Sequence, residues 1–190
     1  EDWELRPGSV KILCGMGIPM GLQFSITAVG CAILQAATNT LGSNAVAAIT
    51  AADRSKGIFQ CLLEAPAITM ATFCGQNLGA RKFERITNGV KRAVIMAFVY
   101  SAIGFIVARF FGPYISLMFI DKGEAEVIAL AQQYINMGSY FYPILAILFV
   151  LRNSIQGVGY SMTAMTTGVF ELVARGVMGF GFVNRLGYDA

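Results

Sequence analysis

Five long runs of apolar residues, joined by short polar connections, constrain this chain more than any other feature. The runs cover residues 12–38, 45–73, 93–111, 127–151 and 162–183. A helix of about 20 apolar residues is long enough to cross the hydrocarbon core of a bilayer. A helix that is apolar all round lies inside a protein or in a membrane. The runs therefore predict membrane-spanning helices.

The composition indicates the same class. Hydrophobic residues make up 56% of the 190 residues and charged residues only 13%, whereas a soluble domain carries about 25% charge. The mean hydropathy is +0.62. We expect an all-α, polytopic protein that crosses the plasma membrane five times. No signal peptide is visible at the N-terminus.

Several function classes are disfavoured. The net charge is +3, and the basic residues lack the aromatic interleaving typical of a nucleic-acid surface. The four cysteines, Cys14, Cys31, Cys61 and Cys74, lie in apolar segments without CxxC spacing. We predict that they are small buried side chains and not disulfides or metal ligands. Histidine is absent, and no nucleophile–base pair is visible. The sequence therefore predicts that the chain is not an enzyme.

One connection combines glycine with positive charge: Gly75-Gln76-Asn77-Leu78-Gly79-Ala80-Arg81-Lys82. Arg81, Lys82, Arg85, Lys91 and Arg92 follow one another closely, and only Glu84 opposes them. A short loop this basic stays in the cytoplasm, so we predict a cytoplasmic loop containing Gly75, Gln76, Asn77 and Gly79. The two glycines are four residues apart, a spacing that also suits helix packing.

The opposite side of the membrane has its own markers. Phe110, Phe111 and Tyr114 resemble an interfacial aromatic belt, beside which Arg109 can extend to the interface. Gly112-Pro113 is expected to end that helix. The following connection is acidic, with Asp121, Glu124 and Glu126 against Lys122, and is assigned to the outer side together with Arg185 and Tyr188.

Prolines predict kinks within three of the runs, at Pro19, Pro66 and Pro143. After the fourth run the chain returns to the cytoplasm through residues 152–160. Arg152 is interpreted as an interfacial anchor there, and Gln156 lies one turn away.

Polar side chains inside the runs are the candidate functional residues. In the first run Gln23 and Thr27 share a helix face, either for hydrogen bonds between helices or to line a cavity. In the second run the spacing places four polar side chains on one stripe: Asp53, Lys56, Gln60 and Glu64. A carboxylate as deep as Glu64 is costly in lipid. It should therefore face the bundle interior or water, or be satisfied by a neighbouring helix.

The fifth run carries Thr163, Thr167, Glu171 and Arg175 at intervals of four. Glu171 and Arg175 can pair, which lowers the cost of burying either charge in a membrane. The pair can be structural or functional.

Four landmarks resemble the multidrug and toxic compound extrusion (MATE) transporters: Gly17-Ile18-Pro19-Met20-Gly21-Leu22-Gln23, Ala47-Ala48, residues 75–80 and Ile155-Gln156-Gly157-Val158-Gly159. The resemblance extends over about residues 10–185. It implies two six-helix lobes that face a central cavity and exchange drug-like, often cationic, molecules for protons or sodium. It implies no other cofactor.

This chain matches one lobe without its last helix. The polar residues 1–10 resemble the cytoplasmic linker between lobes, so residues 11–190 are assigned to the C-terminal lobe, and the sequence is expected to be part of a longer protein. Its implied partners are the lipid bilayer, the N-terminal lobe and a small-molecule substrate.

The resemblance has one departure that bears on ion coupling. Some family members carry acidic residues in the first and fourth helices of this lobe. The matching stretches of this chain contain Ser25 and Thr27, and residues 143–151, and neither stretch has a carboxylate. A sodium site of that type is therefore in doubt, and coupling can depend on an acid of the N-terminal lobe. Glu64 and Glu171 are the local alternatives. The predicted cavity or coupling residues are Glu64, Glu171, Arg175, Gln23, Gln60 and Asp53.

A second hypothesis is a lipid-linked precursor flippase of similar two-lobed build. It requires a cationic cavity for phosphates, to which Arg54, Arg152 and Arg175 could contribute.

Overall fold

The computed structural model describes residues 7–117 and 125–185, and these residues form α-helices and one short 3-10 turn. The elements are α1 (Pro7–Thr38), η1 (Asn39–Leu41), α2 (Ser43–Gly79), α3 (Phe83–Ser116), α4 (Ala125–Ser139), α5 (Tyr142–Gly157) and α6 (Ser161–Arg185). The all-α prediction is confirmed.

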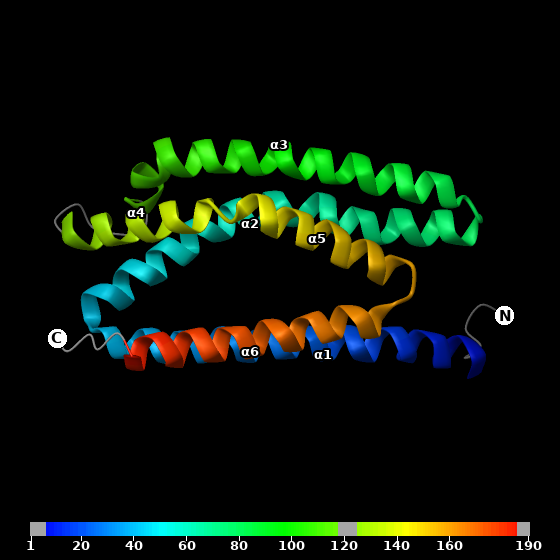
Figure 1. The fold of residues 1–190 in the computed structure, drawn as a ribbon, viewed down its shortest axis with the longest axis horizontal. Coiled ribbons are helices and arrows are strands. Elements are labelled where there is room, and N and C mark those ends of the chain that lie inside the picture. Colours follow the sequence, from blue (N-terminus) through cyan, green and yellow to red (C-terminus); the bar gives the residue numbers. More distant parts are fainter. Residues whose placement is uncertain (1–6, 118–124, 186–190) are drawn as a thin grey trace.

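The helices form two groups (Figure 1). Helices α2, α3, α4 and α5 pack together, while α1 lies beside α6 along most of its length and touches α2 only marginally. The start of α1, the α2–α3 turn and the α5–α6 turn lie at one end of the molecule (Figure 1). The α1–α2 turn, the end of α3 and the end of α6 lie at the other. The chain thus traverses the molecule lengthwise, with α4 and α5 together making one traverse.

Small residues make up much of the core of the four-helix group. Among the fully or nearly fully buried residues are Ala52, Ala67, Cys74, Ala108, Ala131 and Ala146. Small side chains let helix backbones approach closely, which is the usual basis of helix packing in membranes. The closest approach joins α2 and α5, where a Cβ added at Gly157 would lie 2.2 Å from the carbonyl oxygen of Ala71.

The outer surface is apolar. Only Pro19, Gln23, Gly30 and Ala37 are buried in the 32 residues of α1, and exposed side chains such as Phe24 and Ile103 are bulky and apolar. Three helices, α1, α2 and α3, are long and apolar enough to cross a membrane, and the α4–α5 pair makes a fourth if it is counted as one bent span. The chain is a multi-pass membrane protein, as its composition predicts.

The predicted fourth span, residues 127–151, is wrong as a single kinked helix. It consists of α4 and α5, which meet at an angle of 54°. Pro143 lies in the first turn of α5, where its missing N–H has no helical partner to lose. The proline therefore begins a new helix instead of bending an existing one.

The predicted end of the third helix also needs correction. Gly112-Pro113 does not end the third helix, since α3 continues to Ser116. Pro113 lies in the last turn of α3, and Gly112 makes room for a side chain of α4: an added Cβ would lie 2.5 Å from Gln132 Oε1. This glycine serves close packing and not a turn.

The glycine-rich connection is also shorter than predicted. Gly75, Gln76, Asn77 and Gly79 form the last turns of α2 and not a loop. The turn itself begins at Ala80, and the N–H of Lys82 donates to the carbonyl of Asn77 at 2.9 Å. This is a Schellman cap, in which Arg81 takes the left-handed position, with φ 56°.

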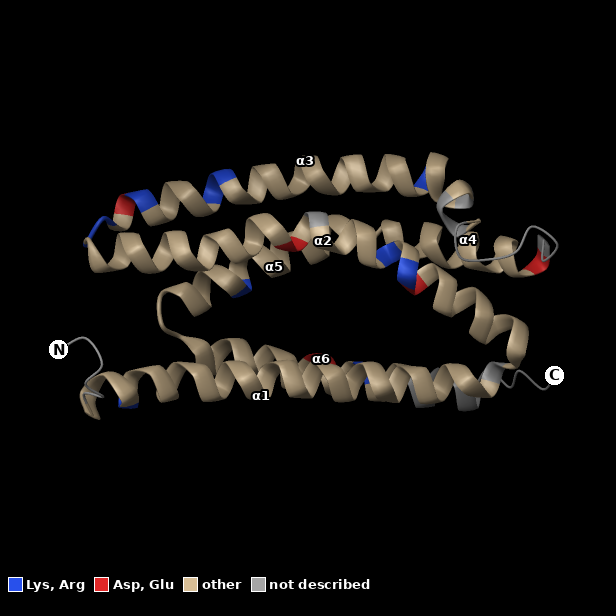
Figure 2. Cartoon of the chain, turned by 180° about the vertical axis from the view of Figure 1, so that it is seen from behind, with Lys and Arg blue, Asp and Glu red and all other residues tan. Residues whose placement is uncertain are grey.

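The α5–α6 turn repeats this cap. The N–H of Tyr160 donates to the carbonyl of Ile155 at 3.2 Å, and Gly159 takes the left-handed position, with φ 98°. The bond pattern matches that of the α2–α3 turn, so both helices end in the same way at the same end of the molecule. Figure 2 shows basic residues gathered around the α2–α3 turn.

The cysteine prediction holds for Cys74 alone, which is buried, whereas Cys14, Cys31 and Cys61 are exposed. None of the four is disulfide-bonded. The outer-side assignments of Asp121, Lys122, Glu124 and Tyr188 lie outside the described residues, and the side chain of Arg185 is likewise not described.

Candidate functional site

A cluster of charged side chains joins α5 to α6. Arg152 of α5, whose side chain is only 12% exposed, lies with Nη1 3.7 Å from Glu171 Oε2 of α6. The other oxygen of Glu171 pairs with Arg175 one helical turn later. Arg175 Nη1 also donates to Cys31 Sγ of α1 at 2.9 Å. The carboxylate of Glu171 is thus held between two guanidinium groups.

Gln23 connects α1 to the same cluster. It is 4% exposed, and its side-chain amide lies 2.7 Å from Gln156 Nε2 and 2.7 Å from Arg152 Nε. With its oxygen turned toward Arg152, the amide accepts a hydrogen bond from a charged donor, which is stronger than a bond from a neutral amide. Gln156 is itself 8% exposed.

Two glycines give these long side chains their space. A Cβ added at Gly30 of α1 would lie 3.1 Å from Arg175 Cδ, and one added at Gly168 of α6 would lie 3.3 Å from Gln23 Cγ. A larger residue at either position would displace a member of the cluster. We call Gln23, Arg152, Gln156, Glu171 and Arg175 the inner polar network.

The network carries two positive charges and one negative charge. A buried ion that lost its partner would be strongly unfavourable, so Glu171 offsets much of the cost of burying Arg152. The excess positive charge favours an anionic or neutral polar group over a metal cation. Within residues 7–117 and 125–185, no group of three His, Cys, Asp or Glu residues is placed to hold a metal ion.

A second charged cluster lies between α2 and α4. Lys56 Nζ is 3.9 Å from Asp53 Oδ1 and 3.6 Å from the centroid of the Tyr134 ring. A Cβ added at Gly138 would lie 2.9 Å from Lys56 Cε, so the lysine stem packs on the bare backbone of α4. An ammonium over an aromatic face gains a cation–π interaction, which together with Asp53 stabilises Lys56 between the helices.

Glu64 is separate from both clusters. It is half-buried, and Gln60 Nε2 of the same helix donates to its Oε1 at 2.8 Å. Among the described residues, no other helix donates a hydrogen bond to Glu64. Glu64 has a neutral partner, whereas Glu171 has two cationic ones.

The comparisons with known proteins decide the family. A family model described as MatE matches residues 19–180, which includes all of the inner polar network. The chain belongs to the MatE family. The resemblance to these transporters is confirmed, and with it the expectation that the chain is not an enzyme.

A curated relative is similar over most of this chain. The probable multidrug resistance protein YpnP of Bacillus subtilis (strain 168) is 24% identical over 171 residues, which cover 90% of this chain and 37% of YpnP. The chain therefore spans little more than a third of the length of that relative.

The predicted site residues of this MatE chain fall into three places. Gln23, Glu171 and Arg175 meet in the inner polar network, Asp53 joins Lys56 and Tyr134, and Gln60 pairs with Glu64. The predicted Glu171–Arg175 pair is confirmed.

The prediction for Arg152 is wrong. Its buried side chain is engaged by Glu171 and Gln23 and is no interfacial anchor. Tyr134 also has no counterpart in the prediction. Gln156 was placed one turn from Arg152, and that spacing was the available signal for the network.

Proposed function

We propose that this chain is the C-terminal lobe of a secondary antiporter in the plasma membrane. It exports drug-like, cationic organic compounds in exchange for protons or sodium by alternating access, together with an N-terminal lobe. In this proposal all five traverses cross the bilayer, including α6, and a sixth helix completes the lobe. Membership of the MatE family supports this function.

The observation that carries the proposal is the position of the inner polar network. It lies at the junction of the α1–α6 pair with the four-helix group, where other contacts are sparse. Glu171 is about 15 Å along α6 from Ser161, close to half the thickness of a hydrocarbon core of about 30 Å. Ionisable residues at that depth face the bundle interior or a water-filled cavity and commonly mark transport pathways.

The basic end of the molecule faces the cytoplasm in this arrangement. Arg81, Lys82, Arg85, Lys91 and Arg92 are all exposed near the α2–α3 turn. The positive-inside rule retains such a turn in the cytoplasm. The start of α1 and the α5–α6 turn lie at the same end (Figure 1) and are cytoplasmic as well.

The two carboxylates have different roles in this proposal. A sodium ion approaching Glu171 would meet the charges of Arg152 and Arg175, so Glu171 holds the network together and does not bind the coupling ion. Glu64 has only a neutral amide partner among the described residues. Of these two carboxylates, Glu64 is assigned the exchange of a proton or a sodium ion as the transporter changes state.

Glu64→Gln in the intact protein tests this assignment. Because Gln keeps the shape and the bond to Gln60 but removes the charge, efflux of a fluorescent cationic dye should fall about tenfold or more while membrane expression stays normal. The matched control is Glu84→Gln, an exposed carboxylate in the first turn of α3. Unchanged efflux in Glu64→Gln would remove this residue from the mechanism.

A flippase for lipid-linked precursors is the second candidate, since Arg152 and Arg175 give the network an excess positive charge suited to phosphates. Arg54 does not support it in the same way, because it is exposed on α2 and makes no ion pair in the described part of the chain. Efflux of a cationic dye by purified protein in liposomes favours the antiporter, and flipping of a lipid diphosphate without dye transport favours the alternative.

A further inference from the structure

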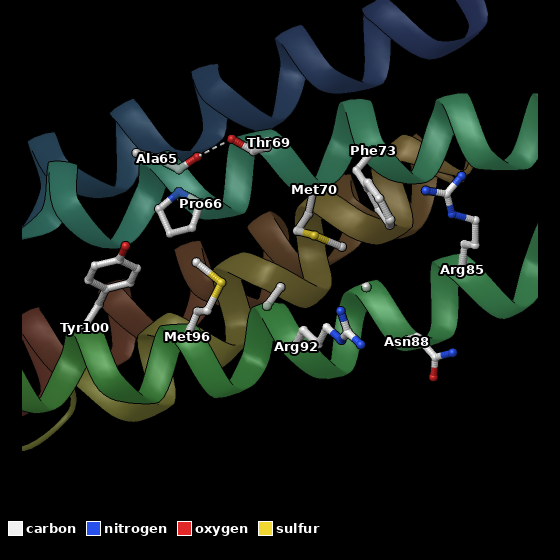
Figure 3. Close-up of a pocket in the computed structure, with 12 residues that line it drawn as sticks. Ala65, Pro66, Thr69, Met70, Phe73, Arg85, Asn88, Arg92, Met96 and Tyr100 are labelled. Atoms are coloured by element: carbon white, nitrogen blue, oxygen red, sulfur yellow. Dashed lines mark hydrogen bonds between the residues drawn. The ribbon is translucent and has the colours of Figure 1, made fainter.

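A groove of about 740 Å³ lies between α2 and α3, away from the inner polar network. Its α2 wall includes Pro66, Met70 and Phe73, and its α3 wall runs from Arg85 to Tyr100. Figure 3 shows these side chains entering the space between the two helices. The groove is therefore lined by two helices that pack directly against each other.

One end of the groove is basic. Arg85 and Arg92 both line it, and they are seven residues apart, so they share one face of α3. In Figure 3 the guanidinium group of Arg85 extends toward α2, the Arg92 side chain lies along α3, and Asn88 turns away. Both arginines are exposed, and within the described residues neither forms an ion pair. Two cations thus converge on the groove without a protein anion.

The other end is apolar. Met70, Met96 and the ring of Tyr100 line it. One edge of the Phe73 ring faces α3, since a Cβ added at Gly89 would lie only 2.2 Å from its Cε1. This end offers hydrophobic and polarisable surface and no charge.

We propose that this groove binds one anionic phospholipid of the cytoplasmic leaflet. The phosphate accepts hydrogen bonds from Arg85 and Arg92, and an acyl chain lies along Met70, Met96 and Tyr100. Arg92 and Tyr100 are about 12 Å apart along the helix, within the thickness of about 15 Å of one hydrocarbon leaflet. Anionic headgroups bind basic pockets between helices at the cytoplasmic side, and guanidinium groups suit phosphate oxygens geometrically.

The charge and the shape of the groove favour this occupant over others. A free phosphate would leave the apolar end in water, and an apolar helix of the same protein would leave the arginines without partners. The inference rests on the orientation proposed above but not on the identity of the transported compound.

The first measurement needs no variant. The intact protein in neutral detergent is titrated with palmitoyl-oleoyl phosphatidylglycerol or with the phosphatidylcholine of the same chains, and bound lipid is counted by native mass spectrometry. We expect phosphatidylglycerol to bind about tenfold or more tightly than phosphatidylcholine, and inorganic phosphate not to displace it. Equal binding of the two lipids, or displacement by phosphate alone, would overturn the proposal.

The second measurement locates the site. Arg85→Gln/Arg92→Gln should weaken phosphatidylglycerol binding about 10- to 30-fold, since each basic residue near an anionic surface contributes a severalfold factor. The charge-matched control is Lys82→Gln/Lys91→Gln, which removes two exposed lysines of the same region that do not line the groove. It should change binding by less than about threefold. An equal loss of phosphatidylglycerol affinity in both double variants would indicate attraction to general surface charge and overturn the proposal. A loss of thermal stability without any change in lipid binding would overturn it as well, because it would indicate that protein covers the groove.

These outcomes are independent of the transport proposal, because neither Glu64 nor the inner polar network lines this groove. Dye efflux can fail in the Glu64 experiment while lipid selectivity holds, and the reverse also applies.

Discussion

Gly157→Ala is the substitution whose effect follows most directly from the geometry. The added methyl would lie 2.2 Å from the carbonyl oxygen of Ala71 and 2.8 Å from its carbonyl carbon and Cα. A carbon–oxygen contact is normally about 3.3 Å or longer, so α2 and α5 must separate by about 1 Å. All three opposing atoms are backbone, and no rotamer change can relieve the overlap. Overpacking of this kind costs about 3 kcal/mol.

The assay is thermal unfolding of the intact, detergent-purified protein, followed by size-exclusion fluorescence. A loss of about 3 kcal/mol would lower Tm by roughly 6–12 °C in a chain of 190 residues, and the shift should be smaller in a longer intact protein. The control is Gly79→Ala, at the end of α2, where an added Cβ meets nothing within 4 Å and the better helix propensity of alanine should leave Tm unchanged or higher. If Gly157→Ala kept the wild-type Tm, or if both variants lost stability equally, the close α2–α5 crossing would be refuted.

Two further predictions use the same assay. Glu171→Gln should destabilise the protein by about 2 kcal/mol, at the low end for a broken buried ion pair because the Glu171 side chain is 34% exposed. The double variant with Arg152→Gln should lose less stability than the sum of the two single losses. Strict additivity would show that the two residues do not interact. Arg81→Gly should leave the protein equally stable or up to about 1 kcal/mol more stable, since glycine adopts φ 56° without strain. Lys82→Gly is the control, because it relieves no backbone strain. Equal effects of the two substitutions on stability would contradict the assigned cap.

The sequence predicts the long helices well because each is one uninterrupted apolar run. Residues 12–38 fall within α1, and residues 162–183 within α6. The break between α4 and α5 is not predictable to the same degree. Pro143 signals an irregularity, but whether the chain kinks or starts a new helix depends on the tertiary contacts of α5, among them the close crossing at Gly157. That crossing is a tertiary contact, and residue spacing does not encode it.

The inner polar network could be predicted only in part. The Glu171–Arg175 pair follows from helical spacing alone. Arg152 is near the end of an apolar run, where arginines commonly reach the interface, so the local pattern favours the wrong environment for it. Its real partners lie on two other helices. The sequence predicts Gln23 as a polar residue inside an apolar run, but only the fold shows that it faces Arg152.

The two charged helix junctions differ in what surrounds them, and this difference bears on which part of the molecule can move. Lys56 lies within the four-helix group, where small buried residues and the Gly157 crossing hold α2, α4 and α5 together independently of any charge. The α1–α6 pair has few such contacts with that group, so Arg152, Glu171 and Gln23 supply much of the connection. Interactions between charges weaken when water enters, because the effective dielectric constant rises, whereas close backbone packing does not. Entry of water between the two helix groups should therefore loosen the α1–α6 pair before it disturbs the four-helix group.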